Sequence, residues 1–108
     1  MRNALAVPHL ARTVSGSSEA IHLRGGNLGV VLDVTAASGT SPVLTISVHW
    51  SANGQRFFSA QPTDVLTAMT AAGGGVKWFA AKAPICRIAW TITGTGTSFS
   101  FSVDTCSY

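Results

Sequence analysis

The chain is 108 residues long, the size of a single domain, and only 10% of its residues are charged, against about 25% in ordinary soluble domains. The net charge is +3, but the seven lysines and arginines are scattered and form no basic run, which argues against nucleic-acid binding. No apolar segment approaches the roughly 18 residues of a membrane-spanning helix. A surface this poor in charge indicates a protein covered by partners, although some proteins have few charged residues without such partners.

The N-terminal segment, residues 1–17, carries no clean apolar period and runs into the sequence SGSS. We predict that it is an extended N-terminal arm, with at most one short strand near Leu10 to Val14, ahead of a β-domain over residues 18–108. Because its apolar content is low, the arm is expected to order only when it binds a partner. Pro8 and His9 interrupt its apolar stretch before signal-peptide length, so we expect no cleaved secretory signal.

Short strand-like runs separated by turn residues fill the rest of the chain, which indicates an all-β fold. In three runs apolar residues recur at every second position, so each set shares one face of a strand and must be buried. The three sets are Leu28, Val30, Leu32 and Val34; Leu44, Ile46, Val48 and Trp50; and Phe99, Phe101 and Val103. Val31 falls on the opposite face of its strand, together with Gly29, Asp33 and Thr35. We expect a small antiparallel β-sandwich, Ig-like or jelly-roll-like.

The last two runs are predicted to form a hairpin across the loop GTGT at residues 94–97. With Thr93 opposite Ser98, three inward apolar pairs fall into register together. The pairs are Ile92 with Phe99, Trp90 with Phe101, and Ile88 with Val103. A slip of one residue would place each of them opposite a serine or an aspartate. Trp90 is then expected at the centre of the core.

The only two cysteines are Cys86 and Cys106. In the hairpin register Cys86 sits opposite Thr105, so the two backbones should be close while the side chains point to opposite faces. A disulfide would therefore need a β-bulge, and without a secretory signal reduced thiols are the default state. The sequence is therefore compatible with both a Cys86–Cys106 disulfide and two free thiols. Two cysteines without a CxxC spacing do not indicate a zinc site.

A second turn is predicted at Asn53-Gly54, the strongest short hairpin signal. A two-residue turn would pair Trp50 with Phe57, whereas a longer turn would bring Phe58 inward. Adjacent phenylalanines cannot both face one side of a regular strand, so one is exposed, bulged or covered by a partner. The best helical candidate is residues 63–72, which could hold one turn before a glycine loop at residues 73–75.

No group of residues predicts catalysis or metal binding. The histidines, His9, His22 and His49, lie far apart in sequence and are expected at surfaces or turns. The four acidic residues are also dispersed, and nothing places two carboxylates across a cleft as glycoside hydrolysis requires. They are Glu19, Asp33, Asp64 and Asp104. We predict no catalytic, metal-binding or cofactor-binding residues, and no enzymatic activity.

The remaining motifs are structural. No serine lies in a GxSxG elbow, and no phosphate-binding GxxxxGK[ST] pattern is present. Trp50 and Trp90 are expected in the core by their position in the alternation. Trp78 is left as the one tryptophan that could bind a sugar.

Five short motifs resemble a family of small β-sandwich virion structural proteins of tailed bacteriophages and prophages. They are LDVT (32–35), SGTSP (38–42), SANG (51–54), RIAWTITG (87–94) and SFSFSV (98–103). Together they span roughly the last three-quarters of the chain. SANG stands where the family more often has an acidic turn resembling SPDG, and the two cysteines are not part of the family pattern.

The resemblance implies a structural role in the virion, assembled in the host cytoplasm. The expected role is capsid decoration or cementing, or a minor capsid position, through packing against the major capsid protein or other virion proteins. A homo-oligomer or a lattice-bound form is implied, without nucleic-acid or membrane partners and without a cofactor. One alternative is a head–tail connector, tail or baseplate component. A further alternative, from another class, is a carbohydrate- or cell-surface-binding module that uses Trp78.

Overall fold

The computed structural model describes residues 2–58 and 64–107, and every regular element in this part of the chain is a β-strand. The strands are β1 (Arg2–Arg12), β2 (Gly16–Ser17), β3 (Ile21–His22), β4 (Asn27–Ser51), β5 (Gly73–Ala80) and β6 (Ile85–Ser107). They form one antiparallel sheet in the order β1-β6-β4-β5, and β2 and β3 also pair with β6. The all-β, antiparallel prediction is therefore confirmed.

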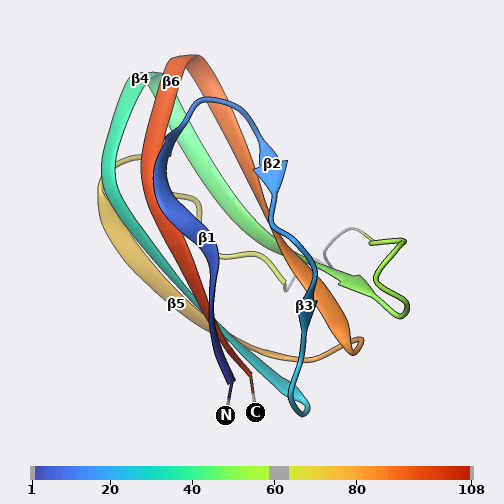
Figure 1. Ribbon diagram of the computed structural model, residues 1–108. Coiled ribbons are helices and arrows are strands. Elements are labelled where there is room, and N and C mark those ends of the chain that lie inside the picture. The colour runs from blue at the N-terminus through green and yellow to red at the C-terminus, as the bar shows by residue number, and fades with distance from the viewer. Residues whose placement is uncertain (1, 59–63, 108) are drawn as a thin grey trace.

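The two longest strands, β4 and β6, pair along their whole lengths and fold over together (Figure 1). Register shifts between Val34 and Val43 of β4 mark the bend. The fold-over is proved by one contact within β6, since the rings of Trp90 and Phe101 are 5.9 Å apart. On a straight strand these two residues would be about 36 Å apart.

Two layers result from this bend (Figure 1). The first layer holds β1, residues 98–107 of β6, residues 27–38 of β4, and β5. The second layer holds residues 85–93 of β6, residues 43–51 of β4, and the short strands β2 and β3. Isolated bridges add Phe58, Val65 and Met69 to the free side of β4 in this second layer.

The core lies between the layers and consists of the predicted alternating residues. All three predicted sets are buried, and they belong to one hydrophobic cluster with Val7, Phe79, Ile88 and Trp90. The period of two thus identified the inward faces correctly. Because the sheet is folded, the inward faces of β4 and β6 cover each other.

The predicted C-terminal hairpin is wrong in its pairing. Residues 85–107 form one bent strand, and both halves pair with β4 instead of with each other. Trp90 is opposite Ile46, and Phe101 is opposite Val34. Trp90 and Phe101 still meet, but they do so edge to face across the core. The predicted proximity of Cys86 and Thr105 in a ladder is wrong for the same reason.

The residues predicted to form an N-terminal arm are instead largely part of the sheet. Arg2–Arg12 forms β1, which pairs with the C-terminal half of β6, and Val7 is fully buried. The Arg12 guanidinium lies over the Trp90 ring at 4.7 Å and over the Phe101 ring at 5.6 Å. Deleting residues 1–17 would therefore open the core rather than remove an accessory segment.

The middle of the chain departs from the expectations in two further ways. Residues 64–72 contain no helix, while Thr63 lies outside the described residues. The predicted glycine loop instead begins a strand, β5, which pairs with residues 27–34 of β4. At the Asn53-Gly54 turn the longer alternative occurs, since Trp50 and Phe58 exchange backbone hydrogen bonds of 2.9 and 3.2 Å. The Phe58 side chain remains largely exposed.

Candidate protein-binding surface

An apolar surface runs across the outer side of the first layer. Leu5 of β1 and Val31 of β4 both lie opposite Asp104 of β6, and Val31 lies opposite Val76 of β5. These four residues therefore form one row across four strands. Leu5, Val31 and Val76 are 59%, 40% and 61% exposed, so they contribute little to the core.

Trp78 extends this row by one step along β5. It lies opposite Gly29, and its ring occupies the space that a side chain at position 29 would need. The glycine lets the indole lie flat on the sheet, where Trp78 remains 54% exposed. We call the surface formed by Leu5, Asp33, Val31, Val76, Trp78 and Asp104 the Trp78 face. Large apolar side chains gathered on one outer face are typical of a binding surface.

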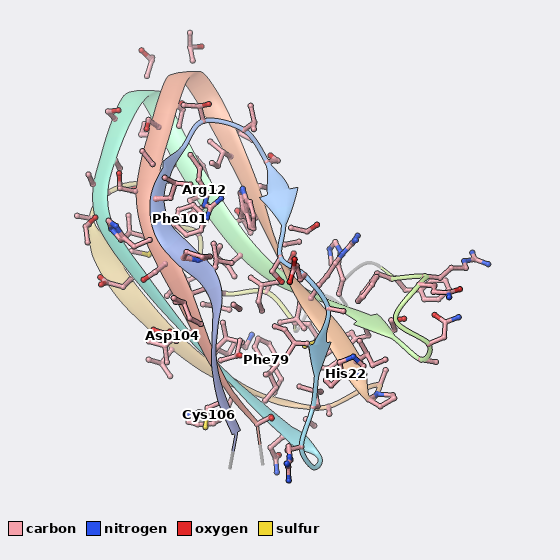
Figure 2. The ribbon with its side chains drawn as sticks, in the orientation of Figure 1. Arg12, His22, Phe79, Phe101, Asp104 and Cys106 are labelled. Atoms are coloured by element: carbon pink, nitrogen blue, oxygen red, sulfur yellow. The ribbon has the colours of Figure 1, made fainter. Side chains whose placement is uncertain are left out.

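The charge on the Trp78 face is negative. Asp33 and Asp104 are both exposed on it, and they are two of the four acidic residues in the chain. Figure 2 shows Asp104 on the outer side of the layer and Phe101 between the layers. Lys77 of β5 does not neutralise this face, because it is turned inward and donates a hydrogen bond to the carbonyl of Val65 at 3.0 Å.

Both edges of the first layer are protected against pairing with another strand. The β1 edge carries Pro8 and two register shifts, each of which breaks the regular row of backbone donors and acceptors. The β5 edge carries the inward-turned Lys77, a charge that would become buried if another strand were added. Neither edge of the first layer is therefore suited to the addition of another strand.

The opposite side of the molecule, the outer side of the second layer, has a different character. His49 of β4 and Arg87 of β6 are opposite each other, and the Arg87 guanidinium lies 4.7 Å from the Phe57 ring. We call the surface formed by Thr45, Ser47, His49, Phe57, Arg87 and Thr91 the Arg87 face. Burial, and to a lesser extent the Arg87 cation, lowers the pKa of His49, so the imidazole is neutral at pH 7. Arg87 therefore sets the charge of this face.

A groove of about 600 Å³ opens between β1 and the β2–β3 segment. Its lining includes Val7, Pro8, Ile21 and Trp90, with Arg12, Glu19 and His22 as polar groups. The Arg12 side chain is already engaged with the two aromatic rings and with the Pro8 carbonyl, to which Nη2 donates at 3.0 Å. The groove is the open side of the two-layer core, and Arg12 closes part of it.

Asp64 forms the one ion pair found in the described part of the chain. Its carboxylate is fully buried, accepts from Lys82 Nζ at 2.8 Å, and accepts from Trp50 Nε1 at 2.9 Å. These two contacts join Asp64, which precedes β5, to Trp50 of β4 and to Lys82 in the loop after β5. In the sequence Asp64 is only one of four dispersed acidic residues, because Trp50 and Lys82 are remote from it along the chain.

The histidines and acids do not converge. Within residues 2–58 and 64–107, no three His, Cys, Asp or Glu side chains lie close enough to hold a metal ion. His9 is exposed and shares a 2.6 Å hydrogen bond with Thr35, and His22 is exposed on β3. No helix among the described residues is long and apolar enough to cross a membrane.

The two cysteines are free thiols in different layers and differ in exposure. Cys86 is fully buried opposite Trp50, and burial raises the pKa of its thiol to about 12. Cys106 is half-buried opposite Gly29, on the Trp78 side of the first layer. The two thiols should therefore react at very different rates.

Alkylation at pH 8.5 tests this difference. Iodoacetamide is expected to modify Cys106 in the folded protein and to leave Cys86 unmodified, because only the thiolate reacts and Cys86 is both neutral and covered. Peptide mass spectrometry before and after unfolding in urea measures both sites. Equal modification of the two cysteines in the folded protein would contradict the placement of Cys86.

Part of the Trp78 face could be predicted from the sequence. Val31 and Asp33 fall on the outward face of their strand by parity, and Trp78 remains outside the core as expected. The contribution of Val76 was missed because residues 73–75 were interpreted as a loop. The VKWF sequence at residues 76–79, rich in β-forming residues, was the available signal for β5.

The sequence matches no protein-family model and no curated protein.

Proposed function

We propose that this chain is a bacteriophage virion structural protein that acts by packing against other proteins. Its most fitting position is decoration or cementing of the capsid, or a minor capsid position. The observation that carries the proposal is the Trp78 face, where Leu5, Val31, Val76 and Trp78 remain exposed on one side of the sheet. Covering such a surface stabilises a complex through the hydrophobic effect.

The motifs that carry the family resemblance support the same proposal. SGTSP lies at the bend of β4, and the end of RIAWTITG lies at the matching bend of β6. LDVT and SFSFSV lie opposite each other in the first layer. These residues define the folded sheet, so the resemblance concerns the architecture as a whole rather than one local turn.

The number of copies per particle tests the proposed location. Quantitative mass spectrometry of purified particles should find this chain in a fixed ratio to the major capsid protein, with hundreds of copies if it decorates the shell. A ring-sized number of copies would instead place it at the neck, tail or baseplate. Its absence from purified particles would contradict a virion role.

Sugar binding is a second candidate function, and the exposed indole of Trp78 is the observation that favours it. Two aliphatic side chains, Val31 and Val76, share its face. A sugar site more often combines an aromatic ring with convergent polar groups in a concave pocket. Binding on a glycan array that disappears in Trp78→Ala would support this alternative over protein packing.

A further inference from the structure

The two outer faces of the molecule are complementary in charge. The Trp78 face carries the exposed carboxylates of Asp33 and Asp104 beside apolar side chains. The Arg87 face carries a guanidinium beside the Phe57 ring. These faces lie on opposite sides of the core, because β4 and β6 contribute one half to each layer.

The charges on both faces lack ion-pair partners within the described part of the chain, where the single salt bridge joins Lys82 to Asp64. Arg87 Nη2 lies 3.5 Å from His49 Nδ1, and Arg87 Nε is buried without a hydrogen-bond acceptor in the described structure. Because Nε is covered, a carboxylate of another molecule would pair with the Nη groups of Arg87, a cation that has no carboxylate partner within the described part of its own chain.

Symmetric packing of two Trp78 faces is disfavoured by the same charges. It would bring the Asp33 and Asp104 carboxylates of two copies together in an interface that excludes water. Pairing of sheet edges is disfavoured by Pro8 and by the inward-turned Lys77. Packing of the Trp78 face on the Arg87 face meets neither obstacle.

We propose that the Trp78 face of one copy packs on the Arg87 face of the next copy of this chain. Asp104 then pairs with Arg87 of its neighbour, and the Trp78 and Val76 side chains cover the Phe57 ring. Such a contact is heterologous, so it produces a ring or an open row of copies. This inference rests on the proposed role of the Trp78 face as a protein-binding surface.

Charge reversal of the purified protein tests this contact without any virion component. Sedimentation velocity over a concentration series should show concentration-dependent self-association of the wild-type chain. Asp104→Arg places a cation against Arg87 of the neighbouring copy, and Arg87→Glu places a carboxylate against Asp104, so each variant alone should associate at least roughly tenfold more weakly. An equimolar mixture of the two should recover association, because every contact in an alternating row is again complementary.

Circular dichroism and thermal unfolding verify that each variant is folded. Thr91→Glu, at an exposed position on the same face, replaces Arg87→Glu if the latter does not fold. A wild-type chain that stays monomeric at all concentrations would overturn the inference. So would a dimer that is insensitive to position 87 or 91, or a mixture that does not recover association.

These outcomes separate the inference from the proposed function. A monomeric chain that is nevertheless incorporated into particles through its Trp78 face would overturn self-packing and leave the virion role supported. Self-association that follows the charge reversals, in a chain absent from particles, would support self-packing and contradict the virion role.

Discussion

Replacing Gly94 by alanine is expected to destabilise the protein by about 2–5 kcal/mol. Gly94 lies at the bend of β6 with φ at +115°, a backbone conformation that side chains disfavour. A Cβ atom at this position would also lie 2.8 Å from the carbonyl oxygens of both Thr40 and Ser41, in the matching bend of β4. The alanine would therefore push the two bends apart where both layers begin.

Gly96→Ala is the matched control for this prediction. Gly96 is two residues further along the same bend, with φ at +61° and no atom within 4 Å of an added Cβ. Its substitution should lower the free energy of unfolding only by the strain of an alanine in the left-handed conformation, about 1–2 kcal/mol. Urea unfolding followed by tryptophan fluorescence measures both variants. An equal loss of stability in the two would show that the bends do not pack as described.

Removing the buried carboxylate is the other change with a large expected effect. Asp64→Ala should cost about 1–3 kcal/mol, because it removes the acceptor of the buried Trp50 indole N–H, while the Lys82 ammonium is 38% exposed and still donates to the Ala80 carbonyl. Asp64→Asn keeps an acceptor for the indole and should be less destabilising. The unfolding free energy in urea is again the measurement.

Lys77→Met supplies the comparison for the ion pair. Lys77 also donates to a group near the core, but its acceptor is the neutral carbonyl of Val65, so the loss should be about 0.5–1.5 kcal/mol. Lys82→Met should cost more than Lys77→Met, since it leaves the Asp64 carboxylate buried without its cation. The reverse order would contradict a stabilising role for the Lys82–Asp64 pair.

The inward faces of the strands could be predicted from the sequence, but the pairing of the last strand could not. Apolar residues are placed symmetrically about the GTGT segment, and two arrangements satisfy this symmetry. A hairpin would pair Trp90 with Phe101 within one sheet, whereas a folded strand makes them meet across two layers. The distinguishing signal was the second bend, SGTSP in β4, which gives each half of β6 a separate partner.

The remaining errors arose where local pattern and tertiary environment disagree. Residues 2–12 lack an apolar period because bulges interrupt β1, yet Val7 still reaches the core. The glycines at residues 73–75 resemble a loop, but they pair with residues 32–34 of β4. The Trp78 face could be predicted only in part, because it depends on which strands lie side by side.

The most direct test of the Trp78 face is incorporation of the variant Val76→Asp into particles assembled in host cells. Val76 is 61% exposed, so the substitution should leave the fold intact while placing a third carboxylate among the apolar side chains of this face. Val14→Asp is the matched control, since Val14 is 71% exposed and lies outside the Trp78 face. We expect purified particles to contain Val14→Asp at the wild-type level and to have lost Val76→Asp. Equal incorporation of both folded variants would contradict this expectation.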